Sequence, residues 1–245
     1  MKLMPSRCNE IAQVVQQVYT EAGLDIQQRK PGVIPLYELI GAYPLRIAAL
    51  SNLTYQTALK FLSIETGHIL ESDQEDRKLS GFLYVYEFAN LFYGCILVEK
   101  EEPIARQRFS AAHELGHYLL HCLPQLQAMT STTRSLILAE TFAGEDETDA
   151  EKPSVEISAG TALPKPTRLP MLIEQMELEA DQFAAELLMP AIACSELVQK
   201  HRRKFGTRPA VLAGRLAPEF LVSRMAMERR LAELDLPDCH DAATL

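Results

Sequence analysis

The first 75 residues carry apolar positions at helical spacing. Between residues 11 and 18 these positions fall on one stripe, which predicts a helix over residues 7–22. The stripe consists of Ile11, Val14, Val15 and Val18. Similar patterns predict two more helices, over Leu36–Ile40 and Thr54–Ile64, with prolines interrupting the chain between them. The acidic stretch Glu71–Asp76 then predicts a loop.

Two segments rich in aromatic and β-branched residues come next. Gly81–Phe88 and Leu91–Val98 are separated only by Ala89 and Asn90, which predicts a hairpin or a pair of sheet strands. A strand beside an active-site helix can pair with an extended substrate through its exposed edge. The alternative is that these strands only build the core.

Two longer helices complete the central pattern. The first is predicted from about Arg106 to Leu123, and the second over Met176–Pro190, where it ends before the proline. Together with the hairpin, they indicate an α+β fold. The chain is expected to divide into a helical part over 1–75, a core over 76–190 with an acidic insertion over 124–170, and a helical part over 191–245.

Composition is consistent with a cytoplasmic enzyme. The chain has 245 residues, of which 47% are apolar, enough for one large domain or two small ones. No apolar run approaches the about 18 residues of a membrane span, and residues 1–7 lack a signal-peptide core. The five cysteines are scattered and odd in number, which is typical of reduced thiols in the cytosol. The sequence does not indicate an oligomeric state.

The run His113–His117 reads HELGH and lies within the first of these longer helices. Histidines four residues apart lie on one helix face, so His113 and His117 can converge on a single Zn²⁺. Glu114 follows the first ligand and can act as general base on a water at the metal, as in the H-E-x-x-H pattern of zinc metallopeptidases. Gly116 costs the helix about 1 kcal/mol relative to alanine, which suits close packing or an open metal face. The alternative is an amphipathic helix whose histidines are surface or core residues.

A catalytic zinc usually takes a third protein ligand, and the helix over 176–190 offers carboxylates. Glu177 and Asp181 are four residues apart and share a face. We expect Glu177 to bind the metal and Asp181 to accept the free ring N–H of a ligand histidine. Glu179 points about 160–200° away from Glu177, so we expect an exposed charge there. An exposed helix carboxylate is also the alternative for Glu177.

His121 lies four residues beyond His117 and is a poor candidate ligand. It would sit about 6 Å farther along the helix axis, so we expect it to support the site or to line the edge of a cleft. The sequence offers candidates to stabilise an oxyanion but does not choose among Tyr118, His121 and His201. The histidines without supporting context are His68 and His240.

At these motifs the chain resembles the ImmA/IrrE family of zinc metallo-endopeptidases. The resemblance rests on residues 106–121, 177–190 and 92–98, of which the last looks like the strand before the active-site helix. It implies a zincin-like, zinc-dependent endopeptidase of the cytoplasm that cleaves a transcriptional repressor of a mobile element or a stress regulon. By the same resemblance, the zinc ligands are His113, His117 and Glu177, and the catalytic base is Glu114. Asp181 replaces the asparagine of many relatives, which preserves an acceptor but changes the charge.

The long connection over 124–170 separates the two metal motifs. Residues 140–156 contain seven acids against one lysine, within a chain of net charge −9. Such a stretch is typical of a disordered insertion, of an active-site lid or of a docking surface for a basic partner. We rank these three alternatives in that order, with the disordered insertion first.

The C-terminal part is basic over residues 200–208. Helices predicted over 211–216 and 223–234 then resemble a helix-turn-helix whose arginines could contact DNA phosphates. Those arginines are Arg224, Arg229 and Arg230. We favour a helical pair packed on the peptidase core, because an acidic chain lacks the overall charge of a DNA binder. Nucleic-acid binding through 200–230 is therefore not expected.

The sequence thus predicts a zinc endopeptidase with a protein substrate and no membrane partner. One rival is a DNA-binding regulator with a vestigial peptidase fold. The other is a protein-interaction module with a structural zinc, although such a site normally closes with four protein ligands.

Overall fold

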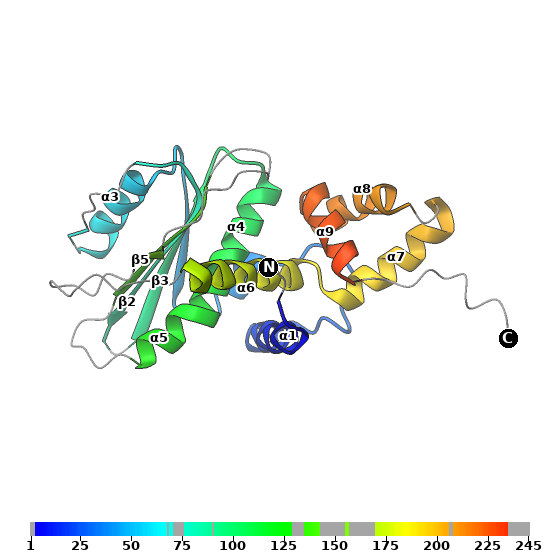
Figure 1. Cartoon of the computed structure of the whole chain (residues 1–245), viewed down its shortest axis with the longest axis horizontal. Helices are drawn as coiled ribbons and strands as arrows, with labels where there is room; N and C mark the ends of the chain where they lie inside the picture. Colours follow the sequence, from blue (N-terminus) through cyan, green and yellow to red (C-terminus); the bar gives the residue numbers. More distant parts are fainter. Residues whose placement is uncertain are drawn as a thin grey trace.

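The computed structural model describes residues 3–67, 69–70, 76–89, 91–128, 135–142, 155–156, 170–205 and 208–234. Within these residues, five strands form a mixed sheet in the order β1-β3-β2-β4-β5, with β1 parallel to β3 and the other neighbours antiparallel. The strands are β1 (Leu45–Leu50), β2 (Leu79–Phe88), β3 (Leu91–Glu99), β4 (Ser135–Phe142) and β5 (Val155–Glu156). Figure 1 shows helices packed about the sheet, which confirms the α+β class.

The predicted hairpin is confirmed as β2 and β3. Phe88 pairs with Leu91, and Ala89 takes a left-handed backbone conformation with φ of 50°, as tight hairpin turns favour. Both faces of the hairpin are buried. Leu83 and Val85 point into the main core, whereas Phe82 and Tyr84 point into a second, smaller core. The alternation follows the two-residue period of a strand and leaves helices to cover each face.

The N-terminal helices are α1 (Pro5–Glu21), α2 (Leu36–Ile40) and α3 (Tyr55–Thr66), which confirms all three predictions. α3 covers the second core, and its N-terminus is capped by Thr54, whose side chain accepts a hydrogen bond from the Thr57 amide. α1 packs against α6, where the Tyr19 hydroxyl donates to the Leu187 carbonyl at 2.6 Å. The loop predicted over 71–76 lies largely outside the described residues.

The two central helices lie on the main-core face of the sheet. The first is α4 (Ile104–His117), which continues as the π-helical turn η1 (Tyr118–Cys122) and then as α5 (Leu123–Ala128). The second is α6 (Pro170–Leu188), which ends before Pro190 as predicted. A Cβ on Gly116 would approach the Phe183 ring to 3.0 Å, so this glycine allows α4 and α6 to pack closely. The helix over 106–123 is confirmed, but the π turn was not predicted.

The C-terminal helices are α7 (Ala191–Phe205), α8 (Pro209–Phe220) and α9 (Arg224–Leu234). α8 continues through Pro218 to Phe220, so the break predicted after residue 216 is wrong. Arg230 is buried, donates to the Met189 carbonyl at 3.0 Å and pairs with Glu186. The idea that Arg230 contacts DNA phosphates is therefore wrong, because its charge is used inside the protein. Leu212, Phe220 and Met227 belong to the main core, so the pair packs on the rest of the fold as expected.

The connection over 124–170 is only partly outside the described residues. Residues 129–134, 143–154 and 157–169 fall outside them, and with them most of the acidic stretch. Residues 135–142 form β4, which pairs with β2, so a disordered insertion is wrong for this segment. Among the described residues, no helix is long and apolar enough to cross a membrane.

Candidate metal centre

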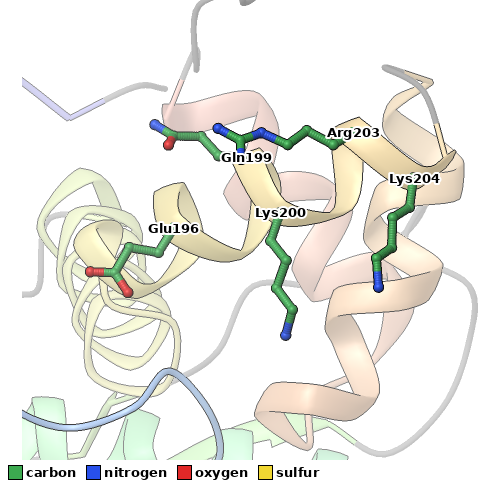
Figure 2. Close-up of a pocket in the computed structure, with 5 residues that line it drawn as sticks. All are labelled: Glu196, Gln199, Lys200, Arg203 and Lys204. Carbon is green, nitrogen blue, oxygen red and sulfur yellow. The ribbon is translucent and has the colours of Figure 1, made fainter.

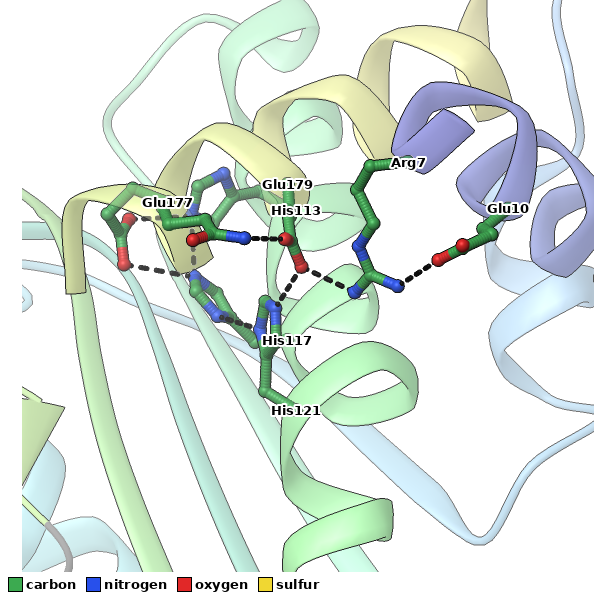
Figure 3. A network of polar contacts seen from close by, with 8 residues as sticks. Arg7, Glu10, His113, His117, His121, Glu177 and Glu179 are labelled. Atoms are coloured by element: carbon green, nitrogen blue, oxygen red, sulfur yellow. Dashed lines mark hydrogen bonds and ion pairs between the residues drawn. The ribbon is translucent and has the colours of Figure 1, made fainter. Parts of the chain in front are cut away.

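Two histidines from α4 and one glutamate from α6 converge in the interior. The Nε2 atoms of His113 and His117 are 3.0 Å apart. Glu177 reaches both, with Oε2 3.3 Å from His113 Nε2 and Oε1 3.4 Å from His117 Nε2. Figure 3 shows the two imidazoles and this carboxylate turned toward one another between the helices. The three residues predicted as ligands are thus brought together.

The other ring nitrogen of each histidine has its own partner. His113 Nδ1 lies 2.9 Å from Asp181 Oδ1, and His117 Nδ1 lies 3.0 Å from His121 Nδ1. These contacts orient both Nε2 atoms inward. Asp181 lies against a ring nitrogen of a ligand histidine, as expected, and His121 lies against His117, which fits the supporting role that was one of its two expected roles.

The donor set fits a divalent cation such as Zn²⁺. Each of the three residues offers one ligand atom, and these atoms all lie within 4.8 Å of one another. Glu177 Oε1 is buried and makes no hydrogen bond. Two imidazole nitrogens and a carboxylate oxygen are a ligand set that zinc uses in catalytic sites. A cation at their centre would satisfy all three lone pairs at once.

Glu114 lies beside this group with its carboxylate buried. Its side chain is fully enclosed, and neither carboxylate oxygen has a hydrogen-bond partner. It rests against β2 at Gly81, where a Cβ would come within 2.6 Å of Oε1. Burial raises the pKa of Glu114 to about 8, with Glu177 adding to the rise and the charge of His113 opposing it. A carboxylate with so high a pKa is well suited to accept and return a proton near neutral pH.

The charges in the centre are strongly coupled. Burial disfavours a charged His113, but hydrogen bonds to Asp181 and Glu177 raise its pKa well above the usual value. Burial lowers the pKa of His117, and the contact with Glu177 only partly offsets this. Burial alone would raise the pKa of Glu177, but the close contacts with both histidines outweigh it and lower the pKa. A neutral His117 and an ionised Glu177 are the forms that bind a metal.

The expectation that Glu179 is an exposed charge is wrong. Only 4% of this residue is exposed. Its carboxylate lies 2.5 Å from Arg7 Nη2 and 3.1 Å from His121 Nε2, and it accepts from Gln175 Nε2 at 2.9 Å. Burial opposes ionisation, but the hydrogen bonds from Arg7, Gln175 and His121 lower the pKa of Glu179 to about 2. Glu179 does point away from Glu177, but α1 lies on that side and covers it (Figure 3).

The remaining candidates lie elsewhere. The Tyr118 hydroxyl donates to the Phe92 carbonyl at 2.9 Å. His201 pairs with Glu219 at 2.6 Å between α7 and α8. Neither group joins the polar cluster of Figure 3, so the structure does not support them as oxyanion donors. The two histidines without context, His68 and His240, are outside the described residues.

Comparison with known protein families matches residues 67–145 and 171–232 to Peptidase_M78, the IrrE N-terminal-like domain. Of the residues drawn in Figure 3, the match includes all except Arg7 and Glu10. This chain belongs to the IrrE N-terminal-like family. The resemblance to ImmA/IrrE endopeptidases is thereby confirmed at the level of the family. No curated protein matches the chain.

Family membership supports a peptidase, and hence a hydrolase, as the class of this IrrE-like chain. The grouping of His113, His117 and Glu177 is consistent with the metal dependence of such a peptidase. The matched ranges leave out residues 146–170, in the acidic part of the connection. The match also continues through α7 and α8 into α9, so the C-terminal helices are not an unrelated addition.

Proposed function

We propose that this chain is a zinc-dependent endopeptidase of the cytoplasm that cleaves a specific intracellular protein, a transcriptional repressor. His113, His117 and Glu177 would hold the zinc, and Glu114 would be the catalytic base. One observation carries the proposal: two buried imidazole nitrogens and a carboxylate converge beside a second buried carboxylate that lacks any hydrogen bond. The family match supports the peptidase class, and the resemblance to ImmA/IrrE enzymes supports the substrate.

Each residue of the centre has a definite task. When bound, zinc supplies a Lewis acid that activates water and polarises the scissile carbonyl. Glu114 accepts a proton on its carboxylate from the attacking water and returns it to the leaving amine nitrogen. The carboxylate of Glu114 is buried and makes no hydrogen bond, so both of its oxygens are free to take up that proton. Asp181 accepts the Nδ1–H of His113 and so keeps the Nε2 lone pair directed inward.

The test of the proposal is specific cleavage. The chain should be co-expressed with candidate transcriptional repressors from the same cell, and each repressor examined for a single cleavage site. Glu114→Gln is the matched control, because it keeps the shape of the side chain and removes the proton acceptor. Cleavage that is equal with wild type and Glu114→Gln would refute the assigned base.

A second candidate function is supported by a basic surface on α7. Lys200, Arg203 and Lys204 line a shallow pocket together with Glu196 and Gln199 (Figure 2). A regulator with a vestigial peptidase fold could use this surface to contact nucleic-acid phosphates. Arg203 and Lys204 also lie in the last turn of α7, where positive charge interacts favourably with the helix dipole and stabilises the helix even if nothing binds there.

Salt dependence distinguishes these readings. If Lys200, Arg203 and Lys204 contact phosphates, replacing all three with glutamine should weaken DNA binding and reduce the salt slope by about one unit per contact. We expect no specific DNA affinity in the wild type. Tight, sequence-selective binding that survives Glu114→Gln would make the regulator the primary function.

A further inference from the structure

The contacts around His117 continue away from the centre as an unbroken series. His117 Nδ1 lies 3.0 Å from His121 Nδ1, and His121 Nε2 lies 3.1 Å from Glu179 Oε2. Glu179 Oε2 in turn accepts from Arg7 Nη2 at 2.5 Å, and Gln175 Nε2 donates to Glu179 Oε1 at 2.9 Å. The series passes from α4 through η1 and α6 to the first turn of α1 (Figure 3).

We propose that His121, Glu179 and Arg7 are positioning residues that hold His117 in the tautomer required for metal binding. We call these three residues the relay. The proposal rests on the proposed function, because it assigns roles around the same centre. It extends that centre to the N-terminal helix, which lies outside the matched ranges of the family.

Once His117 binds a cation, it is defined for every contact of the relay which atom donates the hydrogen bond and which accepts it. Coordination uses the Nε2 lone pair, so the proton of a neutral His117 is on Nδ1. His121 Nδ1 must then accept that proton's hydrogen bond, which places the proton of His121 on Nε2. That N–H donates to Glu179, whose ionised carboxylate can only accept. Arg7 can only donate, so no contact in the series joins two donors or two acceptors.

The opposite tautomer fails at Glu179. If His117 carried its proton on Nε2, its Nδ1 would accept from His121 Nδ1–H. His121 Nε2 would then present a lone pair to the Glu179 carboxylate 3.1 Å away. Residues His121 and Glu179 are only 7% and 4% exposed, so water is poorly placed to relieve this repulsion. The fixed charge of Arg7 favours the acceptor-only carboxylate and so maintains the polarity.

The two ligand histidines are thus held in comparable ways. Asp181 contacts His113 Nδ1 directly at 2.9 Å. Glu179 acts on His117 through the intervening ring of His121. The π turn η1 begins directly after His117 and carries His121. π turns are rare in proteins, but those that occur often lie at functional sites. Here the π turn lies where the relay leaves α4.

The first test is zinc affinity, measured by competition with a chelator. His121→Phe and Glu179→Leu should each weaken binding about 10–100-fold, the usual effect of losing a group that orients a metal ligand. Arg7→Met should have a smaller effect, because its side chain is 32% exposed. The matched controls are Glu174→Leu, on an exposed position of the same helix, and Arg224→Met, in an exposed pair on α9. Both controls should leave zinc affinity unchanged.

The second test reads the tautomer in the metal-free protein. Nitrogen-15 NMR of the ring should place the His117 proton on Nδ1 in the wild type and in Glu174→Leu. Glu179→Leu should shift it toward Nε2, and the absorption bands of the Co²⁺-substituted protein should change with it. Glu179→Gln keeps an acceptor oxygen and should recover part of the affinity. This variant and Arg7→Met preserve the test if Glu179→Leu does not fold.

A double variant decides whether Glu179 acts through His121. In the His121→Phe background, Glu179→Leu should cause no further loss of affinity, since coupled residues are not additive. Fully additive losses, or a Glu179→Leu protein with wild-type affinity, tautomer and Co²⁺ spectrum, would overturn the relay. A wild type that binds no zinc would instead refute the proposed function. The tautomer of metal-free His117 would still test the relay in that case.

Discussion

Gly81 is the position at which one methyl group should separate catalysis from metal binding. A Cβ there would lie 2.6 Å from Glu114 Oε1, and ordinary contact begins near 3.4 Å. Gly81→Ala therefore moves the carboxylate by about 0.8 Å, and a misplacement of about 1 Å can cost about 10²-fold in rate. We expect kcat/KM to fall about 10–100-fold, equivalent to about 1.4–2.7 kcal/mol of transition-state stabilisation.

The zinc content of Gly81→Ala should remain that of the wild type, because Glu114 is not among the converging ligands. The matched control is Gly214→Ala on α8, where an added Cβ meets nothing within 4 Å. Relative to glycine, that alanine should stabilise the helix by about 0.5–1 kcal/mol without changing activity. The assay is cleavage of the proposed repressor substrate, with zinc measured on the same samples. Full activity in Gly81→Ala would refute the placement of Glu114 against β2.

Four more predictions concern Glu114 and two positions at which helices pack. Glu114→Gln should retain zinc but lose at least about 10²-fold in proteolysis. Since burial raises the pKa of Glu114 to about 8, its ionisation destabilises the metal-free fold as pH rises above the ordinary carboxyl range. Glu114→Gln should therefore raise the melting temperature at pH 8 more than at pH 5, and an equal gain at both would contradict this. Gly116→Ala should destabilise the protein in chemical denaturation by about 1–3 kcal/mol, the usual cost of overpacking, because its Cβ would press on Phe183. Arg230→Met should also lower stability, by at least about 1 kcal/mol, because it leaves Glu186 without its partner, and unchanged stability would count against this.

Local patterns were sufficient to predict the elements that carry the centre. Histidines four apart on a helix share a face whatever surrounds them, and the same applies to Glu177 and Asp181 on α6. The alternation in the hairpin likewise reports which residues face each core. These features depend on neighbours in the sequence, so they can be read without the tertiary fold.

The errors lie where distant segments decide the outcome. Glu179 is buried against α1 and contacts Arg7, which lies 172 residues away in the sequence. No local pattern reveals that contact. The π turn carries His121, whose Nδ1 contacts His117 Nδ1, and has no simple sequence signal. β4 is different, because the apolar run Leu136–Ala139 could have predicted a strand. The acidic residues that follow it obscured this signal.

We propose that His113, His117 and Glu177 form one zinc site. The most direct test is the zinc content of purified wild type, His117→Ala, Glu177→Ala and the exposed control Glu174→Ala, measured by elemental analysis. We expect about one zinc per chain in the wild type and the control, and near-complete loss of zinc in the other two variants. Stoichiometric zinc in both His117→Ala and Glu177→Ala would contradict it.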